Sequence, residues 1–371
     1  MARGRLKKVF PGGNTYKGFY SLYDYIIKTD ATRIFVIKGG PGVGKSTFMR
    51  KIGEAMLEQG YDVEFHCCSS DNGSLDGVVI PAVQVALLDG TAPHIVDPKN
   101  PGVVDEIIYL GDYWNEEGLK THKKEILSLN REISRLFCRA YSYLSAAHLF
   151  LEEVRLFYQE TGAFNVGALN KLVLDLTHEI FEGKQRQSEN PGVRRLFATA
   201  ITPDGPVSYL DTIVGHLKKR YIINGDDGTG KTTLVRRLME VALMRGFHVE
   251  VYHCALDPDR VEHLVIPALE IAVVNSVEPH YYKPHKGDTA IDTMICVQQL
   301  TDQNIQEERD TAREMYRRCL EEAVDFLHRA KKTHDEMETY YIPQMNFAEI
   351  EGRRQRVFDR ILKLTEYIPG R

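Results

Sequence analysis

The stretch that decides the fold is IKGGPGVGKST, residues 37–47. It has the order Gly-x-x-x-x-Gly-Lys-Ser and directly follows the apolar run RIFV at residues 33–36. Glycines let the backbone wrap with its N–H groups pointing inward, and a helix that starts at the lysine adds the positive end of its dipole. We therefore expect a site for nucleotide phosphates. The residues expected to form it are Gly39, Gly40, Pro41, Gly42, Val43, Gly44, Lys45, Ser46 and Thr47.

A second stretch of the same form, INGDDGTGKTT, occupies residues 223–233. We expect Lys45 and Lys231 to reach the β- and γ-phosphates in catalysis, and the hydroxyls of Ser46 and Thr232 to bind Mg²⁺. One match can be accidental, but two matches, each between an expected strand and an expected helix, favour nucleotide binding. The second set is Gly225, Asp226, Asp227, Gly228, Thr229, Gly230, Lys231, Thr232 and Thr233.

The two stretches belong to a longer internal repeat. Lys45 and Lys231 are 186 positions apart, and the same offset aligns VIPA at residues 79–82 with VIPA at residues 265–268. One position further apart, TYKGFYSLYD at residues 15–24 aligns with TPDGPVSYLD at residues 202–211. Repeats of this kind mean that a structural unit occurs twice. We predict a tandem duplication with domains at 1–190 and 191–371.

Each repeat has the pattern of an α/β domain. In the first, short apolar runs at 33–40, 61–68, 83–90 and 105–112 are typical of buried strands, and residues 45–60 show helical periodicity. A strand, a glycine loop, a helix and a strand predict a parallel sheet with flanking helices. Amphipathic segments at 116–160 and 302–341 predict a long helical addition to each domain, packed on its own sheet or on the other repeat. A plain helical bundle without a catalytic role is the favoured interpretation of these arms.

The composition agrees with a globular protein of two domains. The chain has 371 residues, 43% of them hydrophobic, and a net charge of −5. That balance gives no general attraction to nucleic acid, and no apolar run has the roughly 18 residues needed to cross a bilayer. The six cysteines fit buried, reduced thiols better than a metal site, although Cys67, Cys68 and Cys254 each lie near a histidine. We expect a cytoplasmic protein without membrane contact.

Acidic residues near the loops are candidates for metal binding and catalysis. Asp89 ends the run VALLD, where an acid commonly anchors Mg²⁺, but the aligned residue of the second repeat is Asn275. We therefore expect the first site to be the more active. Asp71 and Asp257 are present in both repeats and are candidates to orient water or a substrate hydroxyl, with a capping role as the alternative. His94 and His280 are aligned, and a packed structural role is favoured over phosphate contact.

These motifs resemble those of the P-loop NTPase superfamily in each half of the chain. The stretches GGPGVGKST, SLDGVVIPAVQVALLDGTAPH and VDEIIYLGDYW are similar to a bacterial family of duplicated P-loop proteins that carry ATPase or nucleotide-kinase-like labels. The resemblance covers nearly the whole chain. It implies ATP as ligand, with Mg²⁺, and leaves the reaction open. GDDGTGKTT is also similar to the loop of thymidylate kinases, but Asp259-Arg260 lies too close to the loop to match the Asp-Arg motif of that family.

The sequence predicts an ATP-binding protein that hydrolyses ATP or transfers its phosphoryl group. Two alternatives stay open: a small-molecule or nucleotide kinase with its acceptor near Asp71, and a nucleotide-dependent switch whose helical arms bind a partner. Arg131, Arg135 and Arg139 on the first arm are candidates by position for a charge-stabilising arginine. Because a duplication fuses a dimer, we expect a monomer whose repeats face each other as a pseudo-twofold pair.

Overall fold

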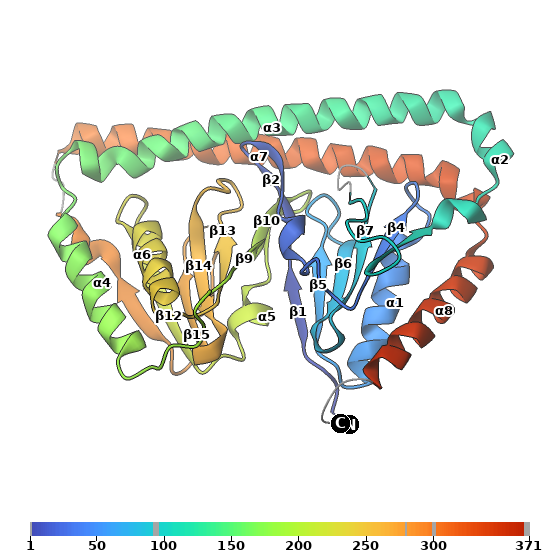
Figure 1. The fold of residues 1–371 in the computed structure, drawn as a ribbon. Helices are drawn as coiled ribbons and strands as arrows, with labels where there is room; N and C mark the ends of the chain where they lie inside the picture. Colours follow the sequence, from blue (N-terminus) through green and yellow to red (C-terminus); the bar gives the residue numbers. More distant parts are fainter. Residues whose placement is uncertain (1, 92–95, 279, 299–301, 367–371) are drawn as a thin grey trace.

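The computed structural model describes residues 2–91, 96–278, 280–298 and 302–366. Two α/β units lie side by side, and a pair of long helices runs across both of them (Figure 1). Each unit contains one six-stranded sheet. In the described residues no helix combines the length and the apolar character needed to cross a membrane.

The first sheet has the strand order β1-β5-β6-β7-β4-β8. Its strands, in that order, are Leu6–Val9, Val63–Cys67, Leu75–Ile80, Val85–Asp89, Arg33–Lys38 and Asp105–Tyr109. The strand that leads into the first glycine loop, β4, lies between β7 and β8 and is parallel to both. The strands expected from the sequence at 33–40, 61–68, 83–90 and 105–112 are therefore β4, β5, β7 and β8.

The second sheet has the order β16-β12-β15-β14-β13-β9, the same arrangement read from the other end. Its strands, in that order, are Thr289–Asp292, Lys219–Asn224, Ile271–Asn275, Val261–Ile266, Val249–His253 and Val193–Phe197. Strand β12 leads into the second glycine loop and lies between two parallel neighbours, β15 and β16.

The expectation of a wholly parallel sheet is wrong at one strand of each sheet. Strands β6 and β14 are antiparallel to both of their neighbours. The cause is a tight turn after VIPA: a 3₁₀ turn (η2, Pro81–Val83; η4, Pro267–Leu269) ends at Gln84 or Glu270 with φ of +53°. A turn of this length joins adjacent antiparallel strands, whereas parallel strands need a longer crossover. Further 3₁₀ turns are η1 (Tyr23–Tyr25), η3 (Leu110–Tyr113), η5 (Thr293–Cys296) and η6 (Ile342–Gln344).

The two sheets meet edge to edge at aligned positions of the sequence. Phe10, just beyond β1, and Phe197, the last residue of β9, exchange backbone hydrogen bonds of 2.9 and 3.0 Å. Two small hairpins follow these residues: β2 with β3 (Gly12–Thr15 and Gly18–Ser21) and β10 with β11 (Thr199–Thr202 and Gly205–Ser208). The junction lies just before the TYKGFYSLYD and TPDGPVSYLD segments, which contribute to the hairpins and for which the sequence predicted no element.

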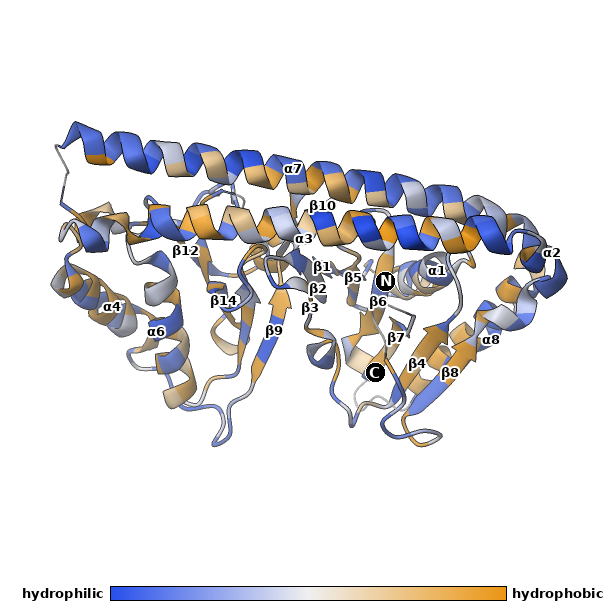
Figure 2. Ribbon diagram, turned by 90° about the horizontal axis from the view of Figure 1, so that it is seen from above, coloured by the Kyte–Doolittle hydropathy of each residue, from blue (hydrophilic) through white to orange (hydrophobic). Residues whose placement is uncertain are grey.

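Two long helices span the molecule. Helix α3 (Lys123–Glu160) runs from above the first sheet toward the second, and α7 (Gln303–Tyr341) runs in the opposite direction beside it (Figure 1). Seen from above, apolar bands alternate with polar ones along both helices (Figure 2). The apolar positions include small residues, such as Ala140 and Ala147 on α3 and Ala323 and Ala330 on α7, all four buried. The helices are α1 (Lys45–Glu58), α2 (Glu116–Thr121), α3 (Lys123–Glu160), α4 (Val166–Phe181), α5 (Leu210–Val214), α6 (Lys231–Met244), α7 (Gln303–Tyr341) and α8 (Phe347–Thr365).

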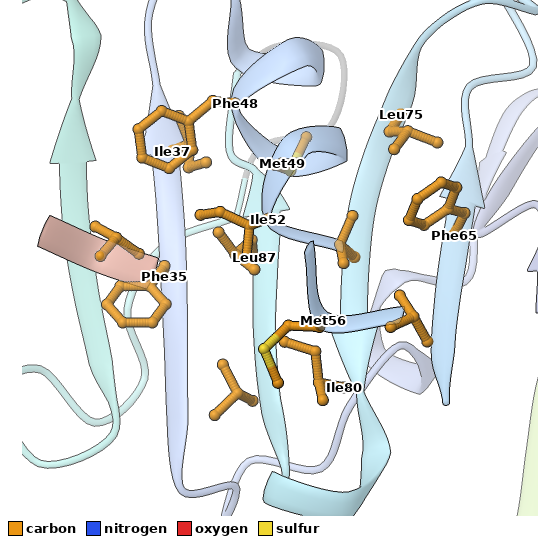
Figure 3. Close-up of a cluster of buried hydrophobic side chains, with 14 of the residues drawn as sticks. Phe35, Ile37, Phe48, Met49, Ile52, Met56, Phe65, Leu75, Ile80 and Leu87 are labelled. Carbon is orange, nitrogen blue, oxygen red and sulfur yellow. The ribbon is translucent and has the colours of Figure 1, made fainter. Parts of the chain in front are cut away.

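Each sheet is completed by a helix from the other half of the chain. In the first core α1 packs over its sheet, with Met49, Ile52 and Met56 pointing to the strands (Figure 3). The same core contains Ile350, Val357 and Ile361 of α8, from the far end of the chain. The second core takes its apolar side chains in the same way from α6 and from α4. The long helices therefore exchange α4 and α8 between the units, so the packing crosses the predicted repeat boundary at 190/191.

Candidate functional site: two glycine loops under the long helices

Both glycine loops lie at the sheet edge that faces α3 and α7. The first loop (residues 39–46) joins β4 to α1, and the second loop (residues 225–232) joins β12 to α6. Each helix begins after a glycine in the left-handed region, Gly44 with φ of +86° and Gly230 with φ of +92°. Residues with a side chain rarely adopt these angles, so glycine is needed there. The free N–H groups of the first helical turn consequently point into each loop.

The two lysines are held in the same way. Lys45 Nζ donates to the carbonyl oxygens of Gly39 and Gly40 at 3.0 and 2.9 Å. Lys231 Nζ donates to the carbonyl oxygens of Gly225, at 2.9 Å, and Asp226. Burial lowers the pKa of Lys231, although nearby carboxylates oppose the shift. Each ammonium group thus lies inside its loop, at the position from which it can turn toward a phosphate.

The expected metal ligands of the first loop are near one another but engaged with other groups. Asp89 Oδ2 lies 3.6 Å from Lys45 Nζ, and Asp89 Oδ1 accepts a hydrogen bond from the Thr91 backbone at 2.8 Å. Ser46 Oγ accepts a hydrogen bond of 2.9 Å from the backbone of Leu75, the first residue of β6. The pairing of β4 with β7 positions these groups, because it places Asp89 beside Ile37 at the start of the loop.

The second loop has an acidic neighbour that the sequence interpretation missed. Glu262 on β14 is buried, and its Oε1 lies 3.3 Å from Thr232 Oγ1. Asn275 donates through Nδ2 to Glu262, while its Oδ1 is buried and has no hydrogen-bond partner among the described residues. Despite burial, Arg260 and other cationic neighbours lower the pKa of Glu262 to about 2, so the carboxylate is ionised. The available signal was the aligned acid, Asp76, in the first repeat.

These oxygen atoms fit a hard divalent cation. Mg²⁺ prefers carboxylate, hydroxyl and carbonyl oxygens. Thr232 and Glu262 supply two such ligand groups close together, and the unpaired Oδ1 of Asn275 adds a third nearby. A bound Mg²⁺ would neutralise phosphate charge at this position. Glu262 therefore provides the carboxylate that Asn275 lacks.

Two arginines also lie at the second loop. Arg260 Nη2 donates to Thr232 Oγ1 at 2.8 Å. Arg260 therefore contacts the loop directly, although the Asp259-Arg260 pair does not match the motif of thymidylate kinases. Arg155, near the end of α3, donates to Glu152 Oε1 at 2.6 Å and lines the same space. The expected candidates Arg131, Arg135 and Arg139 are instead exposed along the middle of α3.

A cavity of about 450 Å³ opens on the second loop. Ligand pockets commonly measure about 300–1,000 Å³, so this one suits a nucleotide-sized molecule. Its polar part contains Lys231, Thr232 and Glu262, and its apolar part contains Phe164 and Leu169, which come from the first repeat. The cavity is therefore formed between the second sheet and the exchanged segment of the other half.

Asp71 and Asp257 bind turn residues of their own segments. Asp71 Oδ1 accepts from the Gly73 backbone at 3.1 Å, and Asp257 Oδ1 accepts from the Asp259 backbone at 3.1 Å. Each also faces a polar side chain of a long helix: Lys331 Nζ is 3.6 Å from Asp71 Oδ2, and the His148 ring atom Nε2 is 3.5 Å from Asp257 Oδ2. The geometry thus shows both aspartates stabilising turns and holding the helices above the loops.

Of the two aligned histidines, only His280 lies in the part of the chain that the structure describes. His94 lies outside the described residues. His280 is buried beside the cavity, and neither ring nitrogen has a hydrogen-bond partner among the described residues. Burial lowers the pKa of His280, so its ring is neutral.

Helix α7 contacts both loops. Near its start, Arg309 and Arg313 form ion pairs with Asp226 of the second loop at 2.6 and 2.7 Å. Near its end, Glu338 Oε1 accepts a hydrogen bond of 3.0 Å from the backbone of Gly42 in the first loop. The helical arms therefore border both loops, while the expectation that they have no catalytic role stays a prediction.

Comparison of the chain with protein-family models, curated proteins and solved structures gave no significant match.

Proposed function

We propose that the protein binds ATP with Mg²⁺ through P-loops and hydrolyses it or transfers its phosphoryl group, with the second loop as the principal site. The observation that carries this proposal is the cavity at the second loop, where Lys231, Thr232 and Glu262 converge. The two aligned halves are, in this proposal, a tandem duplication that works as a fused dimer.

Each group at the second loop has a role that its chemistry supports. The backbone N–H groups before α6 and the ammonium of Lys231 would bind the phosphates. Thr232 and Glu262 would hold Mg²⁺ on the other side of the phosphates. Arg155 and Arg260 would oppose the charge that develops on the transferred group. Phe164 and Leu169 line the same cavity next to Gly230 and would give the ligand an apolar contact surface.

The sequence favoured the first loop as the more active, because Asp89 aligns with Asn275. The cavity that opens at the second loop supports the reverse order, and Glu262 supplies a carboxylate there although Asn275 does not. A nucleotide-dependent switch is the second candidate function. The observation in its favour is that α7 contacts both loops, through Asp226 and Gly42.

Binding and turnover of ATP by single variants test the proposal. Lys231→Ala should lose at least tenfold in ATP affinity, measured by calorimetry with Mg²⁺, and most of the hydrolysis. Lys332→Ala, an exposed position on α7, is the matched control and should behave as the parent protein. ATP affinity and turnover that survive in Lys231→Ala would contradict the assignment to the second loop. ATP consumption that requires an added acceptor, with the phosphoryl group transferred to it, would identify a kinase.

A further inference from the structure

An anionic side chain already occupies the first loop. Glu338 Oε1 accepts the hydrogen bond of the Gly42 N–H, one of the inward-pointing groups that a phosphate would use. The contact is close: a Cβ atom on Gly42 would lie 3.4 Å from the Glu338 Cβ and 3.0 Å from Ile342 Cγ1. Tyr341 and Trp114 cover Gly40 at similar distances. The end of α7 therefore covers the first loop with a carboxylate directed at it.

The corresponding part of α3 brings a cation to the second loop. A Cβ atom on Gly228, which aligns with Gly42, would lie 2.3 Å from the carbonyl oxygen of Arg155. The backbone of Arg155 thus meets the second loop at the glycine that aligns with the Glu338 contact of the first. Its guanidinium lines the cavity beside Lys231. The pKa of Arg155 is raised because Glu262, Glu152 and other acidic groups outweigh the effect of burial, so it stays charged.

The lysines do not distinguish the loops, because Lys45 and Lys231 make the same bonds to loop carbonyl oxygens. The loops differ in the charged side chain that a long helix brings to each: Glu338 of α7 at the first loop and Arg155 of α3 at the cavity of the second. A carboxylate repels a phosphate at short range, whereas a guanidinium attracts it and can donate two hydrogen bonds.

From this contrast we infer that Glu338 closes the first loop to nucleotide by occupying its phosphate position, while Arg155 makes the second loop the one that binds. The inference rests on the proposed nucleotide-binding function. Residue 338 is then the determinant of how many nucleotides the chain holds, and its removal converts a one-site protein into a two-site protein.

The number of ATP molecules bound per chain, measured by equilibrium dialysis with Mg²⁺, tests this inference. We expect one for the natural protein, lost in Lys231→Ala and kept in Lys45→Ala. Glu338→Ala should bind two, and the added one should disappear when Lys45→Ala is combined with it. Arg155→Glu should weaken the single site of the natural protein at least tenfold. Glu336→Ala removes an exposed carboxylate from the same helix turn and should leave one.

The outcomes separate the inference from the function on which it rests. Two nucleotides bound by the natural protein, or one that depends on Lys45, would overturn the inference while supporting nucleotide binding. A folded Glu338→Ala protein that still binds one would also overturn it. Circular dichroism checks that each variant is folded. If Glu338→Ala unfolds, Glu338→Gln replaces it, because glutamine keeps the side-chain volume. Glu338→Gln should show weak ATP binding at the first loop. No binding by any variant would overturn the proposed function itself.

Discussion

At the residue scale, the acids around the two lysines distinguish the loops. The first loop has Asp89, 3.6 Å from Lys45, and the second has Glu262, 3.3 Å from Thr232. The two carboxylates come from different strands, β7 and β14. Each nevertheless lies near the start of the helix that follows its glycine loop, α1 or α6. Comparison of aligned positions alone, Asp89 with Asn275, therefore gives an incomplete picture of the second loop.

Glu262→Gln should reduce the Mg²⁺ dependence of ATP binding. Glutamine has nearly the same size and shape as glutamate but lacks the negative charge beside Thr232. Loss of a group that supports a metal ion commonly costs roughly 10–100-fold in metal affinity. ATP affinity measured across a Mg²⁺ titration checks this, with the exposed Glu240→Gln on α6 as control. An unchanged Mg²⁺ dependence in Glu262→Gln would show that the carboxylate does not hold the cation.

Buried histidines should make stability fall in mild acid. Burial, with Arg195 adding to it, lowers the pKa of His253 from its ordinary value of 6.5 to about 4, and burial next to His280 lowers that of His263 to about 3. Between pH 6.5 and 4 the unfolded chain binds the protons that the folded one does not, so stability rises with pH across this range.

From pH 7 to pH 5 each of these two histidines should cost on the order of 2 kcal/mol of unfolding free energy. Urea unfolding at the two pH values measures the change. His253→Gln should show a smaller fall than the parent protein, because it removes one of the buried histidines whose pKa is lowered. A fall of equal size in the variant would mean that other groups control the acid response.

At the element scale, a buried ion network joins the edge strands of the two sheets. Arg194 on β9 donates to Glu64 on β5 at 2.9 Å through Nη1, and Lys7 on β1 donates to Glu250 on β13 at 2.6 Å. The pairs cross from one unit to the other, and the residues are aligned in the repeats. Lys7 and Arg194 outweigh burial and hold the pKa of Glu64 well below its usual range.

Arg194→Ala should destabilise the junction strongly. It leaves Glu64 buried with one cation fewer, and breaking a buried pair commonly costs about 3–5 kcal/mol. Arg318→Ala, which removes an exposed ion pair with Glu314 on α7, should change stability by no more than about 1 kcal/mol. Urea unfolding of both variants gives the comparison. Similar losses in the two would argue against the network as the source of junction stability.

At the scale of the whole molecule, the exchanged helices make each half incomplete. The fragment 1–190 carries α4, whose apolar face packs on α6 of the other half, and it lacks α8, which covers α1. We expect the fragments 1–190 and 191–371 to fail to form stable monomers separately and to assemble one to one when produced together. Size-exclusion chromatography with light scattering and thermal melting test this. Cooperative melting of monomeric 1–190 alone would contradict it.

The sequence by itself determined the local elements and the loops. Glycines 44 and 230 occupy the left-handed positions that precede α1 and α6, and the apolar runs at 33–40, 61–68, 83–90 and 105–112 became strands. These features follow from backbone sterics and from periodicity over a few residues, so they can be read without knowing the fold. The class of the fold, α/β with helices beside mostly parallel sheets, was predictable for the same reason.

The residues that meet at the loops depend on contacts between distant parts of the chain. Glu262, Arg155 and Glu338 reach their positions through strand pairing and through helices that cross from one unit to the other. Which sheet α4 and α8 cover depends on long-range packing. The amphipathic pattern of a helix predicts that its apolar face is buried but does not predict against which sheet. The antiparallel direction of β6 likewise follows from the turn at Gln84, which hydrophobic periodicity does not predict. The charge presented to each loop, Glu338 at one and Arg155 at the other, is thus a property of the folded chain.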